Sequence, residues 1–423
     1  MAGSLPRSLL PDSATIGPDG MLSIGGVEVA EMAERFGTPL FVYDEEHLRR
    51  RCRDARATFD DGVAYASKAF LCLAMARLAH QEGLCIDVAS GGELHVALTA
   101  GVPAGRCVLH GNNKSLAELA SALEARVGRI VVDSFDEIDR IEALVAGGLS
   151  APDVMIRITP GVEAHTHEFV MTGQDDSKFG FGVASGDAAR AIDRITASPH
   201  LHLVGVHCHI GSQVFSSENF AQAAAVVAPL AAAVGVEELC LGGGLGVPYV
   251  EGEHAPGIPD WGGGAIAACR AAGFGGRITA EPGRSIVAQA AITIYTVGTI
   301  KVLEGIRTYV SVDGGMSDNP RPVLYGSGYE TFVPTRAAAT RPQPVRVVGK
   351  HCESGDILVR EAWVPADLTV GDLLATPVTG AYGHSMASNY NRLPRPPVVF
   401  VANGQARIVV RGETVDDLLR FDV

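Results

Sequence analysis

Eight short apolar segments alternate with helix-forming stretches between about residues 60 and 285, and this alternation restricts the possible folds more than any other feature. Each segment is rich in apolar or β-branched residues and ends at a glycine, serine, proline or other polar residue. They are VAYAS (63–67), LCIDVAS (84–90), CVLHG (107–111), RIVVDS (129–134), VMIRITP (154–160), LVGVHCHIG (203–211), ELCLGGG (238–244) and RITAEPG (277–283). Apolar strands that alternate with helices predict a parallel sheet buried on both faces. Eight such strands favour a (β/α)8 barrel over the alternative, a doubly wound open sheet.

The pattern changes after residue 290, where β-type runs are separated by turn signals and long helical patterns stop. The runs include 292–303, 308–315, 344–352, 356–364 and 396–412. Such runs predict an antiparallel β module. We therefore predict an α/β plus all-β protein: a (β/α)8 TIM barrel at 46–290 and a C-terminal antiparallel β-sandwich or β-barrel domain at 291–423. The N-terminal segment, 1–45, is partly strand-like, and we expect it to pair with the C-terminal domain.

The charge and the cysteine pattern exclude several classes of partner. The formal net charge is -14, which argues against binding to nucleic acid or to an anionic membrane surface. No apolar run reaches the roughly 18–20 residues that span a bilayer, and the N-terminus lacks the basic and apolar regions of a secretion signal. The eight cysteines include no C-x-x-C pair. Reduced thiols in a cytoplasmic protein fit this pattern best.

Polar residues follow four of the predicted strands, at the end of a barrel where function gathers. Lys68 follows the first strand, His209 the sixth, the glycine-rich turn 242–246 the seventh, and Glu281 the eighth. Together they suggest a phosphate-bearing ligand held by backbone N–H groups and a lysine able to form a Schiff base. Each feature alone is more often a solvated charge, a tight turn or a hydrogen-bonded scaffold histidine.

We do not predict a metal site. Neither His165 and His167 nor His207 and His209 have the spacing of a zinc-binding H-E-x-x-H helix, and no cysteine cluster joins them.

Ten motifs in order give the chain a family resemblance. They are YASKAF, DVASGGEL, HGNNKS, GVEAHTHEFVMTGQDDSKFGFG, HCHIGSQ, LGGGLG, EPGRS, VDGGMSDNPRPVLYG, GKHCESGD and GAYGHSMASNYN. Together they closely resemble the diaminopimelate decarboxylases, which are pyridoxal-phosphate (PLP) decarboxylases with an alanine-racemase-like barrel. The resemblance extends from about residue 20 to the C-terminus. The departures are small: YASKAF and LYGSGYE stand where the family often has YAVKAN and LYGARYE.

The resemblance implies decarboxylation of meso-2,6-diaminopimelate to L-lysine and CO2, the final step of lysine biosynthesis, with PLP as cofactor. It implies that Lys68 binds PLP covalently, that Glu281 faces the pyridine nitrogen, and that His209 lies against the ring. It also implies that the remaining cofactor contacts come from Ser212, Gly243, Gly244, Gly283, Arg284 and Tyr382.

The resemblance also implies how the substrate is recognised. Arg284, Arg321 and Tyr325 look like the family's clamp on the distal carboxylate, with Tyr382 nearby, and Glu353 would accept the distal ammonium. Arginine suits this task because its planar fork of donors matches a carboxylate.

Cys352 would protonate the carbon after CO2 leaves, since a free thiol is mostly protonated at pH 7. In the family this loop serves the second subunit, so a homodimer with shared active sites is implied. His351 and Asp356 would then support the loop or lie at an interface.

Three alternatives remain at this stage. A sibling decarboxylase could act on ornithine, D-lysine, carboxynorspermidine or a carrier-bound amino acid, although such substrates would leave the clamp unused. An amino-acid racemase would need acid–base groups on both faces of the ring. A non-catalytic PLP-binding protein would resemble a lone barrel and would not need the β module after residue 290.

Overall fold

The computed structural model describes residues 3–162 and 176–423, and these form two compact units, each described by itself. The barrel unit comprises 51–246 and 255–285, and the β unit comprises 1–50, 247–254 and 286–423. Among the described residues, no helix is long and apolar enough to cross a membrane.

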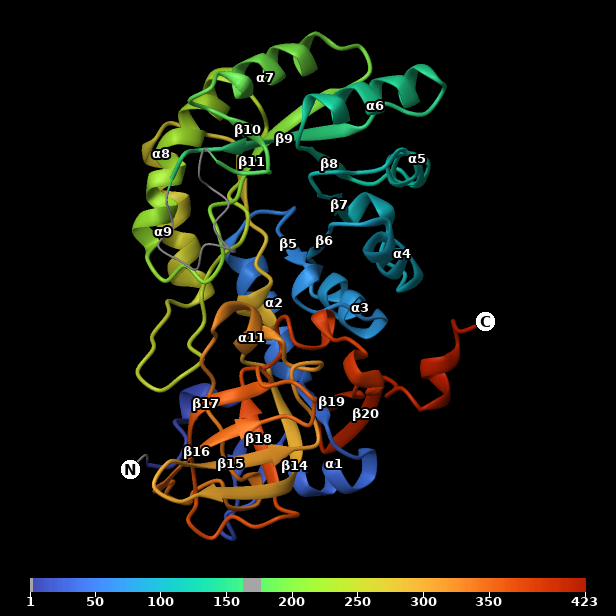
Figure 1. Ribbon diagram of the computed structural model, residues 1–423. Helices are drawn as coiled ribbons and strands as arrows, with labels where there is room; N and C mark the ends of the chain where they lie inside the picture. Colours follow the sequence, from blue (N-terminus) through green and yellow to red (C-terminus); the bar gives the residue numbers. More distant parts are fainter. Residues whose placement is uncertain (1–2, 163–175) are drawn as a thin grey trace. The chain divides into compact units, whose positions relative to one another are not determined.

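The barrel unit contains a ring of eight parallel strands in the order β13, β12, β11, β9, β8, β7, β6 and β5 (Figure 1). A short strand, β10 (Phe181–Gly182), also pairs with β9. Backbone hydrogen bonds from Ala64 to Ala280 and from Ala66 to Pro282 bring the two ends of the ring together. The barrel predicted from the alternating segments is therefore confirmed. The strands are β5 (Ala64–Ala66), β6 (Cys85–Val88), β7 (Cys107–Leu109), β8 (Arg129–Val132), β9 (Asp153–Thr159), β11 (His202–Cys208), β12 (Glu238–Cys240) and β13 (Arg277–Thr279).

Serines at the strand ends explain why the chain changes from strand to helix there. The hydroxyl groups of Ser90, Ser115 and Ser134 each accept a hydrogen bond from the backbone N–H three residues later, which caps the following helix. The helices of this unit lie outside the strands (Figure 1). They are α3 (Leu73–Gln81), α4 (Gly91–Thr99), α5 (Leu116–Ala125), α6 (Phe135–Ala146), α7 (Asp187–Ala197), α8 (Ser217–Val234) and α9 (Ile258–Ala271). The chain passes between the units within α2 (Glu45–Thr58) and α10 (Arg284–Val287).

Small and medium apolar side chains fill the interior of the barrel. One buried cluster takes a residue from each of seven strands, and it includes two of the eight cysteines, which pack here as small hydrophobic side chains. Its members are Ala64, Cys85, Val108, Val131, Met155, Val204 and Cys240. The barrel is thus a packed core, and polar groups gather where the strands end.

The β unit is built on a mostly antiparallel sheet in the order β17, β16, β15, β14, β4, β19 and β20, with β18 also paired to β14. Two pairs, β15 with β16 and β4 with β19, are parallel, a feature that turn signals in the sequence did not predict. The strands are β4 (Leu40–Asp44), β14 (Ala291–Leu303), β15 (Arg307–Val312), β16 (Gln343–Val348), β17 (Ile357–Val364), β18 (Leu373–Pro377), β19 (Val398–Ala402) and β20 (Gln405–Val410).

The N-terminal residues belong to this β unit. Strand β4 lies between β14 and β19. Three short strands, β1 (Thr15–Ile16), β2 (Leu22–Ile24) and β3 (Val27–Glu28), form a separate sheet, and α1 (Val29–Phe36) follows them. A second short helix of this unit, α11 (Arg321–Tyr325), carries residues discussed below.

Candidate functional site

The barrel unit brings the sequence-predicted cofactor residues to the carboxyl ends of its strands. Lys68 lies in a 3-10 turn directly after β5, and its side chain is exposed. His209 and Ser212 follow β11, and Glu281 follows β13. The Arg284 guanidinium donates a hydrogen bond from Nη2 to Ser212 Oγ at 2.8 Å. Residues from three different strand ends therefore surround one mouth of the barrel.

The glycine-rich turn after β12 is packed too tightly for side chains. A Cβ atom at Gly243 would overlap the backbone carbonyl of Glu281, and one at Gly244 would overlap the carbonyl of Gly211. Gly244 also has a φ of +111°, which favours glycine. Glycines therefore let this turn pack closely against the segments after β11 and β13. Such a turn can present backbone N–H groups to a phosphate.

In the same way, Gly283 lets the segment after β13 pack closely against β5. A Cβ atom there would lie 2.9 Å from the Ala66 carbonyl oxygen, so a larger residue would push the Glu281 segment away from β5. This glycine therefore fixes how closely Glu281 approaches the strand that precedes Lys68.

Glu281 is buried, yet both of its carboxylate oxygens have basic neighbours. His207 Nε2 lies 3.0 Å from Oε2 in a hydrogen bond, and His110 Nε2 lies 2.9 Å from Oε1 as an ion-pair contact. Burial raises the pKa of this carboxyl, but the two imidazoles outweigh burial and hold the pKa well below its usual value. Glu281 is therefore a carboxylate at neutral pH, and a carboxylate can still accept a further hydrogen bond because it offers about four lone-pair sites.

His209 is held in its neutral form. Burial, followed by the positive charges of Lys68 and Arg157, lowers the pKa of its imidazole well below the usual value. Its Nδ1 accepts a hydrogen bond from the Gly243 N–H at 3.2 Å. A neutral imidazole that accepts at Nδ1 carries its proton on Nε2, so the contact also fixes the tautomer.

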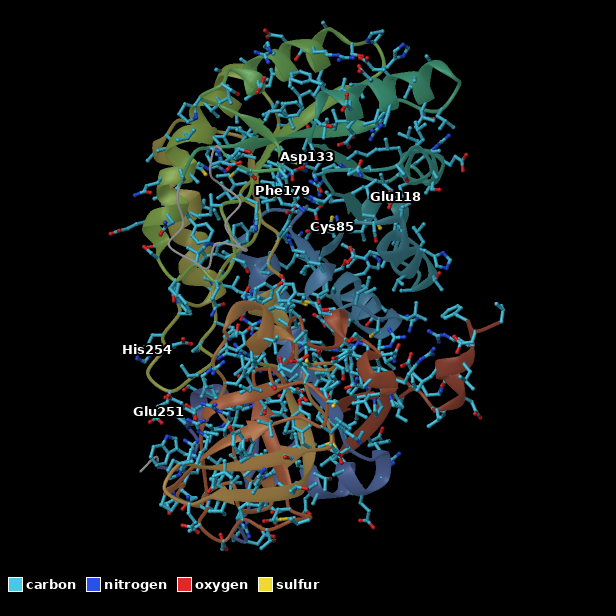
Figure 2. All side chains as sticks on the ribbon, viewed as in Figure 1. Cys85, Glu118, Asp133, Phe179, Glu251 and His254 are labelled. Carbon is cyan, nitrogen blue, oxygen red and sulfur yellow. The ribbon has the colours of Figure 1, made fainter. Side chains whose placement is uncertain are left out.

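Arg157, at the end of β9, is a buried cation that sequence analysis did not assign to the site. Its guanidinium lies 3.8 Å from Asp133 and 4.3 Å from the centroid of the Phe179 ring. Asp133 also accepts a hydrogen bond from the Gly180 N–H at 2.7 Å. Figure 2 labels Asp133 and Phe179 in the barrel unit, where these contacts tie the segment near 180 to the end of β8. His165 and His167 lie outside the described residues.

In the β unit, Arg321 begins α11 and is enclosed by two tyrosines that sequence analysis also missed. The Arg321 guanidinium lies 4.1 Å from the ring centroid of Tyr249 and donates from Nη1 to the Tyr329 hydroxyl at 2.6 Å. The side chain is only 4% exposed, and its Nε has no hydrogen-bond partner among the described residues. A buried guanidinium with an unused donor is suited to an anionic ligand group, because a buried charge without a partner is costly.

Cys352 is the only exposed cysteine among the described residues. Hydrogen bonds from neighbouring residues hold its loop in place. The Cys352 N–H donates to Asn391 Oδ1 at 2.9 Å. Next to it, Asp356 Oδ2 lies 2.9 Å from both the backbone N and the ring Nδ1 of His351. Asp356 Oδ1 also accepts from the Met316 N–H at 2.6 Å. His351 and Asp356 thus support the loop, while the thiol itself faces outward.

The other predicted substrate residues lie in the same unit. Tyr325 ends α11 and is half-buried, and Glu353 is exposed beside Cys352. Tyr382 has a φ of +58°, a left-handed conformation that is uncommon outside glycine and asparagine. Such conformations concentrate at functional positions.

One set of described side chains could in principle bind a metal ion, namely His110, His207 and Glu281. In this arrangement Nε2 of each imidazole faces a separate oxygen of Glu281, so the three side chains already contact one another without an ion. The barrel mouth also offers a lysine, a glycine cradle, an arginine beside a serine, and an ionised buried carboxylate. This donor set fits a phosphate-bearing pyridine cofactor better than a bare metal ion.

Comparisons with known proteins agree with this assignment. Residues 45–288 match a family described as pyridoxal-dependent decarboxylase, pyridoxal binding domain. The chain is similar to the diaminopimelate decarboxylase of Mycobacterium tuberculosis, with 47% identity covering 99% of this chain and 98% of the relative. It is also 47% identical to the Bacillus subtilis enzyme of the same name, covering 96% of this chain and 95% of the relative.

A solved structure gives the same picture. The crystal structure of diaminopimelate decarboxylase from M. jannaschii in complex with L-lysine aligns with a TM-score of 0.89 at 33% identity. The alignment covers 97% of this chain and 98% of that chain. The similarity therefore includes both the barrel unit and the β unit.

Proposed function

We propose, because the chain belongs to the diaminopimelate decarboxylase family, that it decarboxylates meso-2,6-diaminopimelate to L-lysine and CO2 in the final step of lysine biosynthesis. The observation that carries this proposal is the near full-length identity to enzymes of that name. The family membership and the dependence on a pyridoxal cofactor, both expected from the motifs, are confirmed.

The barrel residues have defined tasks in this proposal. When bound, PLP supplies an electron sink for the negative charge left on the α-carbon when CO2 departs. The Lys68 amine would bind the cofactor covalently, and the ionised Glu281 would pair with the ring nitrogen. Neutral His209 would lie against the ring. Ser212, Gly243, Gly244, Gly283 and Arg284 would hold the phosphate, and Tyr382 would contact the cofactor.

The β unit supplies substrate recognition. Arg321 binds the distal carboxylate together with Arg284 and Tyr325, with Tyr382 nearby, while Glu353 accepts the distal ammonium. The tyrosines around Arg321 support this role, because they hold the guanidinium in one orientation while Nε has no hydrogen-bond partner among the described residues. The product L-lysine lacks the distal carboxylate and forfeits charge-assisted hydrogen bonds of about 1.5–3 kcal/mol each, which favours its release.

Cys352 completes the reaction by donating its thiol proton to the α-carbon. Its exposure supports this role, because a proton donor must reach the reacting atom. We propose that the Cys352 loop serves the partner subunit of a homodimer, so that the two active sites are shared, as the family resemblance implies. The eight described cysteines form no disulfide bond, which supports a reducing, cytoplasmic location.

A substrate panel tests the proposal. The PLP-loaded enzyme is given meso-diaminopimelate, L-ornithine or L-lysine separately, and CO2 release is measured. We expect release from diaminopimelate to be at least about 100-fold faster, since loss of two charge-assisted bonds at the distal end corresponds to that factor or more. Faster release from ornithine than from diaminopimelate would overturn the substrate assignment.

A further inference from the structure

Four buried titratable side chains form a continuous chain across the barrel mouth, and the proposed function uses only one of them. His110 Nε2 lies 3.6 Å from Asp87 and 2.9 Å from Glu281, and His207 Nε2 contacts the other oxygen of Glu281 at 3.0 Å. None of the four is more than 7% exposed. They come from β6, from the residue after β7, from the segment after β13 and from β11.

The chemistry of the contacts fixes where the protons lie. An ionised carboxylate can only accept hydrogen bonds, so His207 Nε2, which is hydrogen-bonded to Glu281, must carry a proton. The two imidazole rings meet edge to face, with centroids 5.0 Å apart, and therefore contact the two carboxylate oxygens from different directions. His207 Nδ1 has no hydrogen-bond partner among the described residues, so the ring's polar contact is with Glu281.

We infer that His110 and His207 are positioning residues for Glu281. They fix both of its oxygens and keep it ionised, so that the remaining lone pairs of the carboxylate serve the ring nitrogen of PLP. This inference rests on the proposed placement of Glu281 at that nitrogen. Outer partners that orient an inner ligand act similarly in metal sites, where losing one weakens binding considerably.

The two histidines are not equivalent. His207 makes an aligned hydrogen bond and pairs with Glu281 alone, whereas His110 is shared with Asp87 and makes an ion-pair contact that is not aligned as a hydrogen bond. We therefore expect His207 to have the larger effect on Glu281.

The test compares variants that keep or remove the donor. His207→Leu removes it, and His207→Gln keeps an N–H that can reach Glu281. PLP affinity is measured by equilibrium dialysis, together with the position of the visible cofactor band and kcat/KM. We expect His207→Leu to weaken PLP binding and kcat/KM by about 10- to 100-fold and to shift the band, and His207→Gln to restore most of the loss. His110→Leu should act in the same direction but less.

Two controls address folding. His202→Leu changes an exposed histidine on the same strand and should leave all three measurements unchanged. His207→Asn also removes the contact, because its shorter amide cannot reach Glu281, and it replaces the leucine variant if that one fails to fold. Equal losses in His207→Gln and His207→Asn would overturn the inference.

A double variant separates this inference from the proposed function. If His207 acts through Glu281, adding His207→Leu to Glu281→Gln should cause little further loss, because the two changes remove one interaction. Losses that multiply in full would overturn the positioning role while leaving the placement of Glu281 intact. If Glu281→Gln alone changes neither PLP affinity nor the band, the placement of Glu281 itself fails.

Discussion

Two buried carboxylic acids, one in each unit, have pKa values shifted in opposite directions. Burial raises the pKa of both Glu281 in the barrel unit and Asp318 in the β unit. Glu281 has two imidazoles on its oxygens, and its pKa falls well below the usual value. Asp318 accepts hydrogen bonds from the Tyr295 hydroxyl and the Gly315 N–H but lies near two other carboxylates, and its pKa rises to about 7.

Burial raises the pKa of both acids, so the lowered pKa of Glu281 comes from its two imidazole neighbours. In the barrel unit the histidines maintain a negative charge that a cofactor nitrogen can use. In the β unit Asp318 connects the loop that precedes α11 to the core and needs no charge to do so.

The largest expected effect comes from the covalent attachment point in the barrel unit. Lys68→Ala should abolish the visible absorbance of covalently bound PLP and lower kcat by on the order of 10³-fold or more. Lys68→Arg is the matched control: it keeps the positive charge but cannot form the covalent bond, so it should lose the same absorbance. An unchanged band in either variant would exclude Lys68 as the attachment residue.

Cys352→Ala in the β unit should lower kcat by about 10²- to 10⁴-fold, the usual contribution of a proton donor, without changing PLP affinity. The expected result is a lower kcat together with an unchanged cofactor spectrum. Mixing this variant with Lys68→Ala should restore part of the activity through heterodimers, and each variant alone provides the control. Failure of the mixture to recover any activity would contradict shared active sites.

A smaller effect is expected from the tyrosine that orients Arg321. Tyr329→Phe removes the hydroxyl that accepts from Nη1 and should raise KM for diaminopimelate up to about 10-fold while kcat changes little. Tyr309→Phe, on β15 of the same unit, should have no such effect. Equal kinetics for the two variants would mean that the hydroxyl does not position Arg321.

The smallest effect concerns stability alone and uses Asp318. Because its folded pKa of about 7 lies above the usual value of 3.8, its contribution to stability is full below about pH 4 and is lost as pH rises through about 7. Asp318→Asn should flatten that pH dependence by up to about 4 kcal/mol in the free energy of unfolding, measured by denaturant titration at about pH 4 and pH 8. An identical slope in both proteins would show that Asp318 is not protonated when folded.

The barrel could be predicted from the sequence, and so could the gathering of Lys68, His209 and Glu281 near one another. The carboxyl ends of parallel strands meet at one mouth, so residues that follow separate strands, such as Lys68 and Glu281, can be grouped by their positions in the strand pattern alone. The contacts of Glu281 with His110 and His207 could not be predicted, because they depend on which strand ends face each other after the ring closes. HGNNKS is one of the family motifs, but nothing local indicates what His110 touches.

The β unit was harder to predict in detail. Turn signals favour neighbouring antiparallel strands, so they give no indication of the parallel pairs β15 with β16 and β4 with β19. Tyr249 lies in a stretch, 247–254, that belongs to the β unit although the sequence on both sides of it belongs to the barrel unit. Its contact with Arg321 therefore has no signal in local periodicity.

The central claim, that Glu281 in the barrel unit acts on the cofactor while Arg321 in the β unit recognises the substrate, is tested most directly by substrate preference. We would measure the ratio of kcat/KM for meso-diaminopimelate to that for L-ornithine in Arg321→Lys and Glu281→Gln. Arg321→Lys should lower this ratio by about 10-fold or more with an unchanged cofactor band, whereas Glu281→Gln should shift the band and leave the ratio unchanged. An Arg321→Lys enzyme that loses activity on both substrates equally would contradict the claim.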